Sequence, residues 1–108
     1  MGNVTNSNIE MEIMRLIQSN FKNLNFAGIL KGKEILRIPV ESGSITLQSD
    51  FEENGTYEFF GSIMISVKIN DKDFAEENYL ISGNAVVRYI NEDVDISITG
   101  DIQTQKQF

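Results

Sequence analysis

Apolar and polar residues alternate along one long segment of the chain, residues 56–69. Successive side chains of a β-strand point to opposite faces, so this alternation predicts a strand with one buried face. The apolar face comprises Tyr57, Phe59, Gly61, Ile63, Ile65, Val67 and Ile69. The length and regularity of this face predict the central strand of an antiparallel sheet.

A helical pattern precedes the strands, over residues 8–23. Its apolar positions recur at helical spacing and are Ile9, Ile13, Leu16, Ile17, Phe21 and Leu24. Ser7 and Glu10 are spaced as in a capping box, so we expect Ser7 to cap the start of the helix. The apolar stripe must be buried, and the predicted sheet is the large surface available to cover it.

Four further segments have patterns typical of strands: 34–40, 45–51, 79–91 and 94–103. Residues 23–30 fit either the end of the helix alone, near Asn23 or Asn25, or that end followed by a short strand. Pro39 has no N–H to donate to a ladder, so the first of these is expected to be an edge strand or to end near Pro39. Asn54-Gly55 favours a hairpin turn before the central strand. Residues 70–78 are expected to form a turn and a loop.

Three of the predicted strands carry an interior glycine: Gly61, Gly83 and Gly100. Antiparallel pairing would place Gly61 near Gly83, and Gly83 within a few residues of Gly100. Such glycines mark bulges or bends, or else sites where a helix packs closely. Both interpretations predict an α+β fold in which an N-terminal amphipathic helix packs on a curved antiparallel meander of four to five strands.

The chain contains no repeat or linker, so residues 1–108 are predicted to form a single domain, with residues 1–6 and 105–108 frayed. A helix wrapped by a curved meander is similar in outline to the cystatin-like fold. The inhibitory Gln-x-Val-x-Gly loop of that family is absent from the sequence. The similarity therefore implies nothing about function.

The composition excludes several functions. The chain has no cysteine and no histidine, which removes disulfides, thiolate metal sites and the commonest general base. The net charge is -7 and the pI is near 4.4, so direct binding to nucleic acid or to anionic membranes is not expected. No segment is long and apolar enough to span a bilayer, and the N-terminus lacks a secretory signal pattern. These features predict a cytoplasmic protein.

No catalytic or nucleotide-binding motif is present, and no cofactor is expected. Asp71 and Asp73 begin like a calcium loop, but Glu76 and Ser82 stand where an EF-hand needs glycine and glutamate. Most carboxylates fall in turns, where solvation leaves them poor acids near neutral pH. Glu58, in the middle of the central strand, is expected to make a cross-strand contact, for instance with Arg88. The sequence therefore predicts a protein that is not an enzyme.

Four carboxylates stand in two turns that a meander places at the same end of the sheet: Glu52, Glu53, Glu92 and Asp93. One interpretation is a site for a cation or a basic partner. The other is that these charges keep the protein soluble and prevent edge pairing.

The second face of the central strand is also partly apolar. Phe60, Met64 and Val86 are expected to form one patch there, with Arg88 among its polar neighbours and Leu80 and Ile90 as further apolar candidates. An apolar patch rimmed by polar groups is typical of an interface. The alternative is that another segment, or closure of a barrel, covers it.

Three hypotheses for function follow. The leading one is a small acidic interaction protein that self-associates through the open sheet face. Its expected partner is another copy of the chain or a different protein. The second is an acidic inhibitor or immunity-type protein that binds a basic site on an enzyme, by imitating nucleic-acid charge. The third is a binder of small apolar ligands, in a cavity lined by Tyr57, Phe59, Tyr79 and Tyr89.

Overall fold

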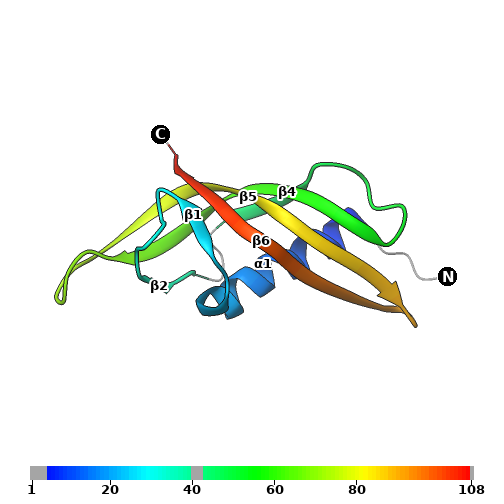
Figure 1. The fold of residues 1–108 in the computed structure, drawn as a ribbon, viewed down its shortest axis with the longest axis horizontal. Helices are drawn as coiled ribbons and strands as arrows, with labels where there is room; N and C mark the ends of the chain where they lie inside the picture. The colour runs from blue at the N-terminus through cyan, green and yellow to red at the C-terminus, as the bar shows by residue number, and fades with distance from the viewer. Residues whose placement is uncertain (1–4, 40–42, 108) are drawn as a thin grey trace.

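One helix lies against the inner face of a curved sheet in the computed structural model, which describes residues 5–39 and 43–107 (Figure 1). The described elements are α1 (Asn6–Asn20), η1 (Phe21–Asn23), β1 (Phe26–Gly28), β2 (Ile35–Arg37), β3 (Gly43–Leu47), β4 (Gly55–Lys68), β5 (Phe74–Ile90) and β6 (Asp93–Lys106). The α+β class, with an N-terminal helix on a curved and mostly antiparallel sheet, is confirmed.

The three long strands β4, β5 and β6 form the antiparallel centre of the sheet. The strand order is β1-β6-β5-β4-β2, and β3 also pairs with β4. β2 and β3 pair with different stretches of β4, which leaves β2 at an edge as Pro39 predicts. β1 runs parallel to β6, so the prediction of a purely antiparallel meander of four to five strands misses this pair.

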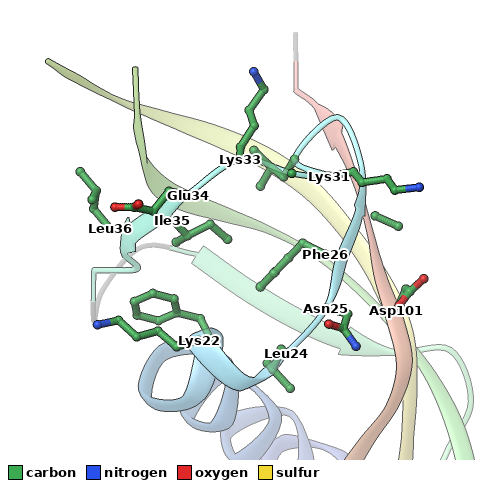
Figure 2. Close-up of a pocket in the computed structure, with 14 residues that line it drawn as sticks. Lys22, Leu24, Asn25, Phe26, Lys31, Lys33, Glu34, Ile35, Leu36 and Asp101 are labelled. Atoms are coloured by element: carbon green, nitrogen blue, oxygen red, sulfur yellow. The ribbon is translucent and has the colours of Figure 1, made fainter. Parts of the chain in front are cut away.

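The connection from β1 to β2 crosses the sheet from the β6 edge to the β4 edge, and residues 29–34 are here called the arch (Figure 2). Thr104 of β6 holds its start. The Thr104 hydroxyl donates to the carbonyl of Ala27 and accepts the N–H of Leu30 at 3.1 Å. A side chain at Gly28 would meet the carbonyl oxygen of Thr104 at 2.1 Å, so glycine is required for this close approach.

The start of α1 differs from the prediction. Thr5 is the N-cap: its side chain accepts the N–H of Asn8 at 3.3 Å, and the side chain of Asn8 accepts the N–H of Thr5 at 3.2 Å. The prediction that Ser7 caps the helix is wrong. Glu10 is occupied elsewhere, because its carboxylate accepts the N–H of Leu47 in β3 at 2.8 Å. The helix therefore begins at Asn6 and is fastened to β3 through Glu10.

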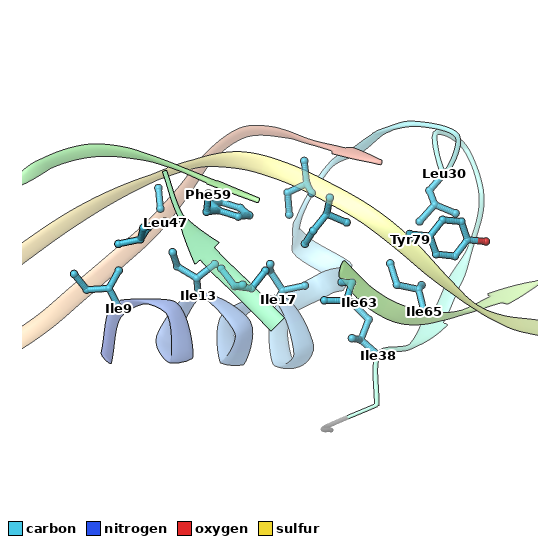
Figure 3. Close-up of a cluster of buried hydrophobic side chains, with 14 of the residues drawn as sticks. Ile9, Ile13, Ile17, Leu30, Ile38, Leu47, Phe59, Ile63, Ile65 and Tyr79 are labelled. Carbon is cyan, nitrogen blue, oxygen red and sulfur yellow. The ribbon is translucent and has the colours of Figure 1, made fainter. Parts of the chain in front are cut away.

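The core fills the space between α1 and the concave face of the sheet (Figure 3). Ile9, Ile13 and Ile17 are fully buried and point from the helix toward the strands. The other buried apolar residues are Leu30, Ile38, Ile45, Leu47, Phe59, Ile63, Ile65, Val67, Tyr79, Ile81, Ala85, Val87 and Ile102. The predicted apolar face of residues 56–69 thus supplies the centre of the core.

Several strand bounds differ from the prediction. β5 begins at Phe74, because residues 74–78 pair with β4 instead of forming a loop. β2 ends at Arg37 and β3 at Leu47; Val40, the predicted end of the first strand, lies outside the described residues. α1 includes Asn6 and β6 continues through Lys106, both within segments expected to be frayed.

The glycines lie where the sheet bends. Gly83 pairs with Phe59, two residues from Gly61, and sits opposite an irregular stretch of β6 between Thr99 and Gln103. Gly100 lies in that stretch with a φ of 70°, a conformation that favours glycine. The expected proximity of the three glycines is confirmed. The bend, together with the long hairpins, gives a molecule with extents of 51 × 21 × 20 Å.

Candidate functional site

The sheet face opposite α1, here called the outer face, exposes large apolar side chains. Phe60 of β4 is 46% exposed and Leu80 of β5 is 38% exposed. Met64 is half-buried on the same face. Leu80 pairs with Ser62, which stands between Phe60 and Met64 along β4, so the three apolar residues are neighbours.

Uncharged polar residues flank these three on β5 and β6, while Glu58 lies beyond Phe60 along β4 on the same face. Ser82 pairs with Phe60, Asn78 pairs with Met64, and β6 contributes Gln103 and Gln105 opposite Ser82 and Leu80. Phe60, Ser62, Met64, Asn78, Leu80, Ser82, Gln103 and Gln105 are together called the outer patch. A shallow hollow of about 420 Å³ lies within it, bordered by Phe60, Leu80, Gln103 and Gln105.

Two residues expected in the patch lie farther along the same face. Val86 pairs with Thr56, four residues from the position opposite Phe60, and is half-buried. Arg88 is exposed and pairs with Asp95 of β6. Glu58 pairs with Asn84, so the expected contact between Glu58 and Arg88 is wrong. Leu80 was expected only as a further candidate, and Gln103 and Gln105 were not expected in the patch. Their positions depend on the strand register, which is set by the length of the β4–β5 turn.

The outer face carries charge toward its β2 end, where the charges are partnered. Ser66 is buried and donates to the carboxylate of Glu76 at 2.5 Å. Arg37 of β2 lies 3.6 Å from the same carboxylate. These contacts separate the uncharged outer patch from the end of the sheet.

The four carboxylates predicted to cluster all lie at one end of the sheet and are exposed. Glu52 and Glu53 belong to the β3–β4 loop, Glu92 belongs to the β5–β6 turn, and Asp93 is the first residue of β6. The side chain of Asn54 accepts the N–H of Tyr89 at 2.8 Å, which ties the two segments together. Within residues 5–39 and 43–107, no group of three or more acidic side chains is arranged to hold a metal ion.

The four aromatic residues expected to line one cavity do not share one, and of the four only Tyr57 borders the hollow of about 510 Å³ at the β3–β4 loop. Phe59 and Tyr79 are buried in the core, and a Cβ at Gly83 would lie 2.8 Å from the ring of Phe59. Tyr57 hydrogen-bonds with the β3–β4 loop, donating to the carbonyl of Glu53 at 2.5 Å, and Tyr89 is half-buried beside that loop. The core fills the space in which the third hypothesis placed a ligand.

Among the described residues, Tyr79 is a titratable group whose pKa is shifted by its surroundings. Burial raises the pKa of Tyr79, and the carboxylate of Glu77, whose Oε2 lies 3.5 Å from the hydroxyl, raises it further. Glu77 is also paired with Lys106 at 3.4 Å. A tyrosine with a raised pKa is neutral at physiological pH and has no role as a base there.

The described part of the chain contains no helix long and apolar enough to cross a membrane. No protein-family model matches the sequence, and no curated protein or solved structure is significantly similar to it.

Proposed function

We propose that this protein is a small non-enzymatic interaction protein that self-associates through the outer patch. The observation that carries the proposal is the exposure of Phe60 and Leu80, side by side at the centre of the face that α1 does not cover. Large apolar side chains gathered on an uncovered face are typical of protein interfaces. The lack of histidine and cysteine in the chain supports a role without catalysis.

Charge favours a second copy of the chain as the partner. The chain has a net charge of -7, yet the residues of the outer patch carry no formal charge. Two copies related by a two-fold axis can therefore meet at the patch without burying like charges against each other. The exposed ring of Phe60 stands beside the hollow of about 420 Å³, so one copy offers both a projection and a recess.

A pair of charge insertions on adjacent residues of β4 tests the proposal. Met64→Glu places a carboxylate within the outer patch, where burial in an interface without a partner is costly. We expect this variant to remain folded but to lose association, measured by size-exclusion chromatography with light scattering. Ile65→Glu is the matched control, since Ile65 is fully buried on the opposite face and its loss should unfold the domain.

Two results would contradict self-association. One is a wild-type protein that stays strictly monomeric at high micromolar concentration. The other is a Met64→Glu variant that unfolds as completely as Ile65→Glu, which would mean that both faces of the sheet are internal.

Inhibition of an enzyme with a basic site is the second candidate function. The bond between Asn54 and Tyr89 favours it, because it holds the turns that carry Glu52, Glu53, Glu92 and Asp93 at one end of the sheet. A basic partner would bind there by charge attraction, and such binding weakens as salt rises. Reversing Glu92 and Asp93 to lysine should abolish it, while reversing Asp71 and Asp73 at the opposite end should not.

A further inference from the structure

A pocket of about 700 Å³ opens between the C-terminal end of α1 and the arch (Figure 2). It exists because α1 ends at Asn20, before it has covered the whole concave face of the sheet. η1 then leads the chain to β1 at one edge, and the arch returns it to β2 at the other edge. The pocket therefore opens to solvent between the helix and the arch, beside the core.

The pocket has a mixed lining, in which apolar side chains form one part and Asn25 and charged side chains form the rest. Phe21 and Leu24 approach from the end of the helix, Phe26 from β1 and Ile35 from β2. All four are partly buried and pack against the core, and Figure 2 shows Leu24, Phe26 and Ile35 directed toward the space. The volume falls within the range of roughly 300–1,000 Å³ that is typical of small-molecule sites.

Basic side chains stand around the mouth of this pocket. Lys22, Lys31 and Lys33 line it, and none of them forms an ion pair within the described ranges. The other basic side chains without such a pair there are Lys72 and Arg88, so three of the five gather at one opening of an acidic protein. Glu34 and Asp101 also line the pocket, which leaves a single net positive charge at its rim.

We infer that this pocket binds an amphipathic monoanion, a molecule with an apolar body and one carboxylate. The apolar body would enter between Phe26 and Ile35, and the carboxylate would remain at the mouth. The ammonium groups extend outward from the rim in Figure 2, but the flexible lysine stems allow them to fold over a bound carboxylate. A multiply charged head group is disfavoured, because Glu34 and Asp101 would repel it.

This inference is independent of self-association, because the pocket and the outer patch lie on opposite faces of the sheet. It also differs from a cavity lined by Tyr57, Phe59, Tyr79 and Tyr89, none of which lines the pocket. It assigns instead Phe26 and Ile35 as contacts for the apolar body, and Lys22, Lys31 and Lys33 as contacts for the carboxylate.

Isothermal titration with two surfactants of closely similar tail length, below their micelle concentrations, tests both halves of the inference. Laurate should bind with one-to-one stoichiometry, and dodecyltrimethylammonium should bind at least about tenfold more weakly, because its charge has the wrong sign. Amide chemical shifts of Leu24, Phe26 and Ile35 should change on laurate addition, whereas those of Phe60 and Leu80 should not.

Charge reversal at the rim provides the matched comparison. Lys31→Glu with Lys33→Glu should weaken laurate binding by about tenfold or more. Lys72→Glu with Arg88→Glu changes the net charge equally at two positions that do not line the pocket, and it should leave laurate affinity unchanged. Ile35→Trp, checked by circular dichroism for a retained fold, should block the pocket and remove binding.

The inference is overturned if laurate fails to bind the wild type, if both surfactants bind equally, or if the shift changes centre on Phe60 and Leu80. Equal loss of affinity in the two double charge-reversal variants would also overturn it, since the effect would then come from net charge. Met64→Glu should bind laurate like the wild type, so failure of either proposal can be recognised separately.

Discussion

The ring of Phe59 occupies the space that a side chain at position 83 would need. A Cβ at Gly83 would lie 2.8 Å from the Cζ of Phe59, which is 1% exposed and has no room to move. We expect Gly83→Ala to lower the free energy of unfolding by about 1–3 kcal/mol through overpacking. Urea denaturation measures this change.

Further substitutions distinguish a steric clash with Phe59 from strain in the backbone. The cost of Gly83→Ala should shrink in a Phe59→Leu background, whereas Gly100→Ala should cost about 1 kcal/mol in either background because of its positive φ. Gly55→Ala, with no atom within 4 Å of the added Cβ and an ordinary φ, serves as the neutral control. An equal cost for Gly83→Ala in both backgrounds would exclude the clash with Phe59.

Ionisation of the Tyr79 hydroxyl should lower the free energy of unfolding at high pH. Burial and the Glu77 carboxylate raise the pKa of Tyr79 above the ordinary tyrosine value of 10.0, so the folded state retains this proton more strongly than the unfolded state. The resulting stability is complete below pH 10 and is lost as pH rises through the folded pKa. The urea midpoint of Tyr79→Phe should therefore fall less above about pH 10 than that of the wild type. If Tyr79→Phe and Tyr89→Phe lose stability in parallel there, Tyr79 has no special role.

At the scale of single elements, the first turn of α1 depends on Thr5. Thr5→Ala removes the acceptor for the N–H of Asn8 and should reduce stability by about 1 kcal/mol. Ser7→Ala, which removes the exposed hydroxyl that the sequence pattern favours as a cap, should change stability little. Thermal unfolding of both variants decides between the two caps, and a larger effect at Ser7 would contradict the observed one.

The choice of cap shows where sequence patterns stop being sufficient. Ser7 and Glu10 have the right spacing, but Glu10 is used by Leu47, a partner 37 residues away. The long strands were predictable, because alternation over residues 56–69 and 94–103 reflects burial of one face. A short strand within residues 23–30 was one of two expectations for that segment, but the parallel pairing of β1 with β6 was not predictable, because its three residues have no readable period.

The sequence predicted which face of the sheet carries the candidate site, but it did not predict which residues of the neighbouring strands lie beside Phe60 and Met64. Alternation places Phe60 and Met64 on the outer face whatever the neighbouring strand does. Which residue of β5 joins them depends on where β5 begins, and Phe74-Ala75-Glu76-Glu77 gives no alternating signal of a strand. Leu80 rather than Val86 therefore completes the outer patch. The pocket was invisible in the sequence, because its lining comes from α1, β1, the arch and β2 together.

At the scale of the whole molecule, the net charge distinguishes the two candidate functions. Two copies that each carry -7 repel one another, and added salt screens that repulsion. Sedimentation equilibrium should therefore show self-association through the outer patch to strengthen between about 20 mM and about 500 mM NaCl. Binding of a basic enzyme by the acidic turns should weaken over the same interval. Self-association that weakens with salt would exclude the uncharged outer patch as its surface.

The parallel pairing of β1 with β6 affects how the chain acquires its fold. Thr104 and the carbonyl of Ala27 that it binds are 77 residues apart, so a ribosome completes α1 and β1 long before it makes their partner strand. Until then, Phe26 has no neighbour at that edge, and Ile102, which ends fully buried, is missing from the core. Closing so long a loop is slow, because its entropy is lost before the contacts are gained. Until β6 is made, the nascent protein thus lacks the β6 side of its core, and the apolar surface exposed there favours aggregation in that interval.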